Sequence, residues 1–141
     1  MLFKIFNKKA HQMNVPELRK ILDDTRGQVF LAYRPKKVHQ IRNIKLDLPD
    51  VKLPIRVYYP SEKTELRPAI VLFHGGGFIA GTLDIYDRLC RRLCIDNKMI
   101  VISVDYRLAP EHKFPTGLND CFEATKWLYK NGEILGVDTE K

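Results

Sequence analysis

The sequence has no long apolar run and few cysteines. No stretch approaches the roughly 20 consecutive apolar residues that a membrane-spanning helix requires, so no membrane span is predicted. Residues 1–9 contain neither the apolar segment nor the small-residue cleavage site of a secretory signal. The three cysteines are too few, and odd in number, for a disulfide framework. We therefore expect a cytoplasmic protein with reduced thiols.

Motifs for zinc and for nucleic acids are also missing. Cys90 and Cys94 are four residues apart, but no two further ligands stand in register with them for a zinc site. We expect these two residues and Cys121 to be free thiols that bind no metal. The net charge is +7, yet the basic residues are dispersed and no nucleic-acid-binding motif surrounds them. We interpret them as a solvated surface, with no nucleic-acid partner.

The composition is that of one globular domain that begins with a helical segment. The chain has 141 residues, of which 45% are hydrophobic and 29% charged. Asn14 and Glu17 predict the N-terminal cap of a helix that continues to about Tyr33. Residues 1–37 are therefore predicted to be helical and somewhat separate from the rest.

The remainder of the sequence predicts an α/β fold. Four segments have strand patterns and two have helical patterns, namely residues 40–48, 55–59, 69–73 and 99–104 for strands and residues 84–96 and 118–130 for helices. The third strand is wholly apolar and the fourth is apolar except for Ser103, which predicts burial of both strands on both faces. This order predicts a sheet with right-handed crossover connections. The apolar positions of the last helix are Cys121, Phe122, Ala124, Trp127 and Leu128.

Two connecting segments complete the pattern. Residues 49–54 begin and end with proline, which predicts a turn between the first two strands. Residues 131–141 are predicted to be a polar linker without a strand. The sheet is then unfinished, and we expect an exposed edge through which the chain can self-associate.

Chemistry is concentrated in His74–Gly81, whose sequence is His-Gly-Gly-Gly-Phe-Ile-Ala-Gly, between a strand and a helix. Consecutive glycines allow backbone conformations closed to other residues, and neighbouring N–H groups turned into one concavity bind a negative oxygen. The tetrahedral intermediate of ester hydrolysis carries such an oxyanion. The alternatives are a phosphate loop, which lacks its Gly-Lys-Ser/Thr here, and a purely structural turn. His74 could also be a base or metal ligand, although a histidine at a strand end more simply anchors the loop.

These residues resemble a known family. The strand 69–73 followed by His74, Gly75, Gly76, Gly77 and Phe78 resembles the HGGG-type oxyanion motif of lipases and esterases with the α/β-hydrolase fold. Residues 104–115 are similar to the second signature of the hormone-sensitive-lipase-like esterases, and residues 118–130 resemble the helix that follows it. The similarity covers about residues 40–138. Residues 1–37 resemble the N-terminal helical part of that family's cap more loosely.

The resemblance implies a fold and a set of site residues. It implies an incomplete α/β-hydrolase sheet preceded by N-terminal cap helices, with residues 1–37 as the cap segment and residues 38–141 as the N-terminal half of the hydrolase domain. The N–H groups of Gly76 and Gly77 would stabilise the oxyanion, while Gly75 shapes the turn. The structural residues that support this oxyanion motif would be His74, Phe78, Asp105, Tyr106 and Arg107. The substrate would be a small carboxylic ester, and no cofactor or metal is implied.

The family's nucleophile is not recognisable in this sequence. The family needs Gly-x-Ser-x-Gly, followed by an acid and a histidine. Only two serines are present, Ser61 in a charged turn and Ser103 within an apolar strand, and neither has flanking glycines. We therefore expect the catalytic triad beyond Lys141, and a chain that is truncated and inactive alone. The alternative hypothesis is a non-catalytic binding or interaction protein, or a degenerate remnant of an esterase.

Overall fold

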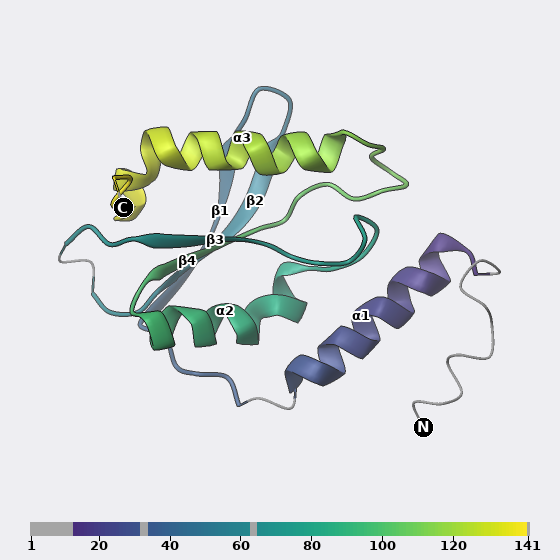
Figure 1. The fold of residues 1–141 in the computed structure, drawn as a ribbon, viewed down its shortest axis with the longest axis horizontal. Coiled ribbons are helices and arrows are strands. Elements are labelled where there is room, and N and C mark those ends of the chain that lie inside the picture. Colours follow the sequence, from purple (N-terminus) through teal and green to yellow (C-terminus); the bar gives the residue numbers. More distant parts are fainter. Residues whose placement is uncertain (1–12, 32–33, 63–64, 141) are drawn as a thin grey trace.

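The protein is described here by a computed structural model that covers residues 13–31, 34–62 and 65–140 (Figure 1). A four-stranded sheet lies between helices on its two faces, which confirms the predicted α/β class. The strands are β1 (Gln40–Asp47), β2 (Lys52–Tyr59), β3 (Ala69–Phe73) and β4 (Ile100–Val104). The helices are α1 (Val15–Leu31), α2 (Leu83–Asn97), α3 (Thr116–Asn131) and the short 3-10 helix η3 (Gly132–Leu135).

The strand order is β1-β2-β4-β3, with β3 and β4 parallel and the other pairs antiparallel. Strand β4 is therefore central, and all five of its residues are buried. Because side chains alternate along a strand, Ile102 joins the core beneath α3, whereas Val101 joins the core beneath α2. Two apolar layers, one on each face, hold the sheet between its helices.

Side-chain caps begin two of the helices, α1 and α2. Asn14 Oδ1 accepts a hydrogen bond of 2.9 Å from the N–H of Glu17, as predicted for the start of α1. Thr82 caps α2 in the same way, through a 3.2 Å bond from the N–H of Ile85. None of the helices in the described residues is long and apolar enough to cross a membrane. The boundary proposed after residue 37 stays a prediction.

The hairpin between β1 and β2 is tighter than predicted. Its turn is closed by reciprocal hydrogen bonds between Leu48 and Val51, so β2 begins at Lys52 and not after Pro54. Pro54 fits inside the strand because its carbonyl accepts the N–H of Asp105 just past the end of β4. The missing N–H of proline therefore removes only a terminal hydrogen bond of the ladder.

The prediction that β3 is buried on both faces was wrong. Its first four residues are half-buried and Phe73 is 40% exposed, in contrast to the fully buried β4. The physical reason is the position of β3, because among the described strands it is hydrogen-bonded only to β4 and forms the edge of the sheet. Similarly, Phe122 is one of the apolar positions predicted for the last helix but is exposed, while Ala124 and Leu128 are buried.

The polar linker predicted for residues 131–141 was also wrong. Helix η3 continues from α3, and Leu135 and Val137 are buried in the core beneath α3. Gly136 turns the chain in the left-handed conformation, after which Val137 forms an isolated parallel bridge with Arg67 beside β3. Two apolar side chains among polar neighbours were enough to bring this segment onto the core.

Candidate functional site

The candidate site is the glycine loop, His74–Gly81, which connects the carboxyl end of β3 to α2. Gly76 has φ +155°, and a Cβ atom there would lie 1.7 Å from the carbonyl oxygen of Ala80. The carbonyl of Gly76 accepts hydrogen bonds from the N–H groups of Ile79, at 3.2 Å, and Ala80, at 3.1 Å. The loop therefore folds back on Gly76 so closely that only glycine fits.

The backbone N–H groups of Gly76 and Gly77 donate no hydrogen bond to any of the described residues. Gly77 has φ +63°, and the space beside it is open, since a Cβ atom there would meet nothing within 4 Å. Backbone N–H groups that the fold leaves unpaired are available to water or to the oxygen of a ligand. Two adjacent donors in a glycine turn can hold a negatively charged oxygen.

Two tyrosines hold the start of the loop. The hydroxyl of Tyr106 donates to the carbonyl of His74, and that of Tyr86 donates to the carbonyl of Gly75 at 3.1 Å. The imidazole of His74 is buried and stacks on Tyr106, with ring centroids 4.4 Å apart. A Cβ atom on Gly81 would lie 2.2 Å from His74 Nδ1. His74 is thus a packing residue at the base of the loop, and no group of acidic, cysteine and histidine residues around it could hold a metal within the described chain.

Residues 105–115, which we call the second loop, lie against the glycine loop. The N–H of Ala109 donates to the carbonyl of Phe78 at 2.8 Å. Arg107 forms a bidentate pair with the buried carboxylate of Asp120, with a shortest distance of 2.6 Å, and this pairing raises the pKa of the guanidinium. Burial raises the pKa of Asp105 at the start of the loop. These contacts hold the second loop against the glycine loop and α3.

Two openings border this region. Phe78, which is 56% exposed, lines a small, mostly apolar cavity of about 120 Å³ together with Phe114 and Leu118. A second cleft of about 680 Å³ lies between the β1–β2 turn and the start of α3, and no residue of the glycine loop lines it. Of these two openings, the apolar cavity adjoins the candidate site.

Helix α1 reaches the glycine loop through two residues that no motif marked. Arg19 Nε donates to the carbonyl of Ile79 at 2.6 Å, and Asp23 Oδ1 accepts from the N–H of Gly81 at 2.8 Å. The only signal in the sequence was their spacing of four residues, which places them on one helix face. That spacing does not say what the face contacts.

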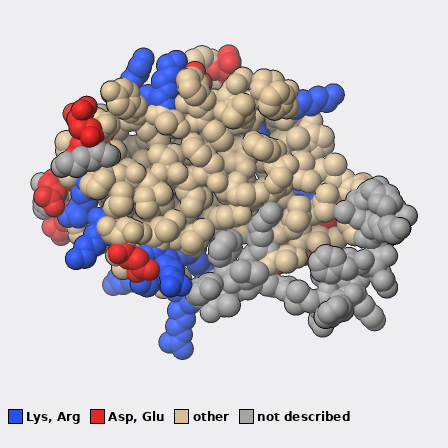
Figure 2. Space-filling view, viewed as in Figure 1, with Lys and Arg blue, Asp and Glu red and all other residues tan. Residues whose placement is uncertain are grey.

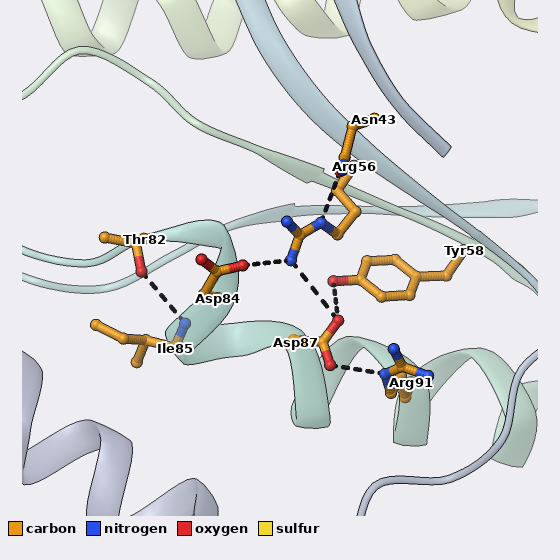
Figure 3. A network of polar contacts seen from close by, with 8 residues as sticks. All are labelled: Asn43, Arg56, Tyr58, Thr82, Asp84, Ile85, Asp87 and Arg91. Atoms are coloured by element: carbon orange, nitrogen blue, oxygen red, sulfur yellow. Dashed lines mark hydrogen bonds and ion pairs between the residues drawn. The ribbon is translucent and has the colours of Figure 1, made fainter. Parts of the chain in front are cut away.

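A polar network fixes the other end of the loop, where α2 begins (Figure 3). Arg56 of β2 contacts Asp84 at 2.8 Å and Asp87 at 3.7 Å, both on α2. Asp87 also accepts from the hydroxyl of Tyr58 at 3.1 Å and pairs with Arg91 at 2.6 Å. The network attaches the start of α2 to β2. Because the glycine loop ends at α2, the network also fixes the position of that end of the loop.

Neither serine stands where a nucleophile would be expected. Ser61 is exposed just after β2, and its hydroxyl donates to the carbonyl of Glu62. Ser103 is fully buried within β4. Burial raises the pKa of all three thiols to about 11, namely those of Cys90, Cys94 and Cys121. These thiols are therefore poor nucleophiles near neutral pH.

Comparison with known proteins identifies the family. Residues 70–141, about half of the chain, match the family model described as alpha/beta hydrolase fold. The chain belongs to the α/β-hydrolase fold family. The resemblance drawn from the two motifs is thereby confirmed.

The relatives of this α/β hydrolase include ester-cleaving enzymes. Over 104 residues it is 44% identical to an arylesterase of Saccharolobus solfataricus, covering 74% of this chain and 34% of the relative. Over 134 residues it is 34% identical to an ethyl acetate hydrolase of Pseudomonas putida, covering 93% of this chain and 42% of the relative. An esterase structure from Pyrobaculum calidifontis superposes with a TM-score of 0.84 at 34% identity, over 96% of this chain and 44% of that one. The chain thus spans less than half the length of these relatives.

Proposed function

We propose that this chain supplies the oxyanion-binding part of a carboxylic ester hydrolase. The observation that carries the proposal is the pair of N–H groups on Gly76 and Gly77, which the described residues leave without an acceptor. Their place after a β-strand of an α/β hydrolase, in a family whose relatives include esterases, supports the same function.

The chemistry follows from the charge that develops during ester cleavage. When a nucleophile adds to the carbonyl carbon, the electron pair of the C=O bond moves to oxygen. The N–H groups of Gly76 and Gly77 donate to this oxyanion and lower the barrier. Loss of one such donor typically costs about 10²–10³ in rate. The apolar cavity beside Phe78 suits the hydrocarbon part of a small ester.

The nucleophile is expected to be a serine other than Ser61 and Ser103. By itself, the 141-residue chain is then expected to hydrolyse p-nitrophenyl acetate no faster than buffer. Turnover that exceeds the buffer rate, and that Gly76→Ala abolishes, would contradict this expectation of inactivity while supporting the role of the loop.

A hybrid enzyme tests the proposal directly. In the hybrid, this chain replaces the matching residues of the Saccharolobus arylesterase, whose remaining residues are kept. We expect the folded hybrid to hydrolyse p-nitrophenyl acetate. Gly76→Ala should lower its kcat about 100-fold, because the added Cβ collides with the carbonyl oxygen of Ala80 and moves the N–H groups away from the oxyanion. Gly77→Ala adds the same methyl group at the second proposed donor, where it meets nothing within 4 Å, so we expect it to lower kcat less than Gly76→Ala does. A folded hybrid without turnover would sink the proposal and favour the alternative of a non-catalytic binding protein.

Location and self-association belong to the same proposal. The free thiols of Cys90, Cys94 and Cys121 support a reducing compartment such as the cytoplasm. Self-association through the β3 edge is supported by the surface in Figure 2, where the centre of the face over β3 is uncharged and most charged side chains lie around its rim. The basic residues are dispersed along the sequence, which supports a solvated surface and not a nucleic-acid-binding one.

A further inference from the structure

We propose that Arg19 and Asp23 of α1 are positioning residues that hold the glycine loop in the conformation presenting the Gly76 and Gly77 N–H groups. The inference rests on the proposed function for the purpose of that conformation, but the contacts themselves concern this chain alone. Both loops leave the sheet on the side where α1 lies (Figure 1).

Arg19 connects α1 to both loops at once. Its Nε donates to the carbonyl of Ile79 at 2.6 Å, and its Nη2 donates to the carbonyl of Ala109 at 2.9 Å. The N–H of Ala109 in turn donates to the carbonyl of Phe78 at 2.8 Å. The guanidinium therefore spans a backbone junction at which the two loops already meet.

Asp23 lies one helical turn beyond Arg19 and holds the last residue of the glycine loop. Its Oδ1 accepts the N–H of Gly81 at 2.8 Å. Gly81 has φ +110° and packs against His74 at the other end of the loop. Arg19 and Asp23 thus bind the loop at Ile79 and Gly81, on both sides of Ala80, whose N–H donates back to Gly76.

Glu111 forms an ion pair with the more exposed side of the guanidinium. Its carboxylate accepts from Arg19 Nη1 at 3.0 Å and from Nη2 at 2.7 Å. These bonds lower the pKa of Glu111 to about 2, so the carboxylate stays charged at neutral pH. The side chain of Glu111 is 56% exposed, whereas that of Arg19 is 31% exposed. The contacts to the two backbone carbonyls are therefore better shielded from solvent than the ion pair, and they carry the proposal.

Arginine suits this position better than lysine. Three acceptors from two loops surround one planar group, and Nε and Nη2 donate in fixed directions. A lysine ammonium lacks the Nε donor partway along the side chain, so it cannot reproduce the same set of bonds. Asparagine at position 23, by contrast, keeps an oxygen that can accept the N–H of Gly81.

Amide NMR spectra of the 141-residue chain test the inference. The variants are Arg19→Ala and Asp23→Ala, with Arg19→Lys and Asp23→Asn as conservative replacements. The readouts are the Gly76 and Gly77 amide shifts and the hydrogen-exchange rates of Ile79 and Ala80, which donate to Gly76. Glu111→Gln is the matched control, because it removes the ion pair and leaves both carbonyl contacts.

We expect Arg19→Ala and Asp23→Ala to move both glycine signals and to speed exchange at Ile79 and Ala80 about tenfold. Asp23→Asn should restore the wild-type spectrum, Arg19→Lys should not, and Glu111→Gln should stay close to wild type. Unchanged glycine signals in folded Arg19→Ala and Asp23→Ala would overturn the inference, as would equal effects of Glu111→Gln and Arg19→Ala. If Arg19→Ala does not fold, the two variants of Asp23 decide the outcome.

A separate experiment tests the proposed function independently of this inference. In it, the wild-type chain is titrated with methylphosphonate, a tetrahedral oxyanion. A shift of the Gly76 and Gly77 signals with added anion supports the oxyanion role. Absence of any response contradicts that role, while the spectra without anion still decide whether α1 positions the loop.

Discussion

At the scale of single residues, two neighbouring glycines differ in what they require. At Gly76 a side chain would collide with backbone, since its Cβ atom would lie 1.7 Å from the carbonyl oxygen of Ala80. At Gly77 only the positive φ of 63° opposes a side chain, because the space is open. The first constraint is steric and the second conformational.

We therefore expect Gly76→Ala to lower the free energy of unfolding by about 3 kcal/mol and Gly77→Ala by about 1 kcal/mol. Urea denaturation followed by circular dichroism measures both values. Equal losses in the two variants would show that the close approach between Gly76 and Ala80 does not constrain the loop.

Thiol reactivity is a second prediction at this scale. Burial raises the pKa of Cys90, Cys94 and Cys121 to about 11. At pH 8 about 0.1% of such a thiol is ionised, against roughly a quarter of an ordinary cysteine. Labelling with a disulfide reagent should then be about two orders of magnitude slower in the folded chain than in urea. Rapid labelling of any one cysteine in the folded chain would show that its surroundings are more open than described.

At the scale of elements, the start of α2 matters because it follows the glycine loop directly. Thr82 accepts the N–H of Ile85 and so satisfies one of the free donors of the first turn. Thr82→Ala should lower the free energy of unfolding by about 1 kcal/mol. Thr125→Ala is the control, because Thr125 is exposed within α3 and its loss should change stability by less than about 0.5 kcal/mol. If Thr82→Ala lowered the free energy of unfolding no more than Thr125→Ala, the proposed role of Thr82 as the cap of α2 would be contradicted.

The elements also show where local patterns predict structure well. The cap at Asn14, the apolar run at β4 and the glycine loop were all predicted from consecutive residues, and the structure contains each of them. Helix capping, strand propensity and the backbone freedom of glycine each depend on a few neighbouring residues, so they can be predicted from the sequence without knowledge of the fold. The oxyanion role itself stays a prediction.

At the scale of the whole molecule, apolar surface is left uncovered. Leu118, Phe122 and Tyr129 follow one another along the solvent side of α3, with Phe122 64% exposed. Exposed apolar residues that gather on one face are typical of an interaction surface. The face over β3, between α2 and α3, is also uncharged at its centre (Figure 2).

We expect the chain to self-associate and to bind an apolar dye. Phe73→Glu should weaken self-association about tenfold, because Phe73 is 40% exposed on the edge strand β3 and burial of a phenylalanine contributes about 1.5–3 kcal/mol. Thr125→Glu is the matched control, as it adds the same charge to an exposed position of α3 without removing an apolar group. Analytical ultracentrifugation measures the change. A wild-type chain that stays monomeric and binds no dye would refute the proposed self-association.

The sequence by itself determined the α/β alternation, the cap at Asn14 and the glycine loop, because each depends on residues that are consecutive in the chain. Only the tertiary structure decided that β3 is an edge strand, that Phe122 faces solvent and that Leu135 enters the core. It also brought Arg19 to the carbonyl of Ile79, sixty residues away in sequence. Such contacts depend on how distant segments pack, and no local pattern records which surfaces will meet.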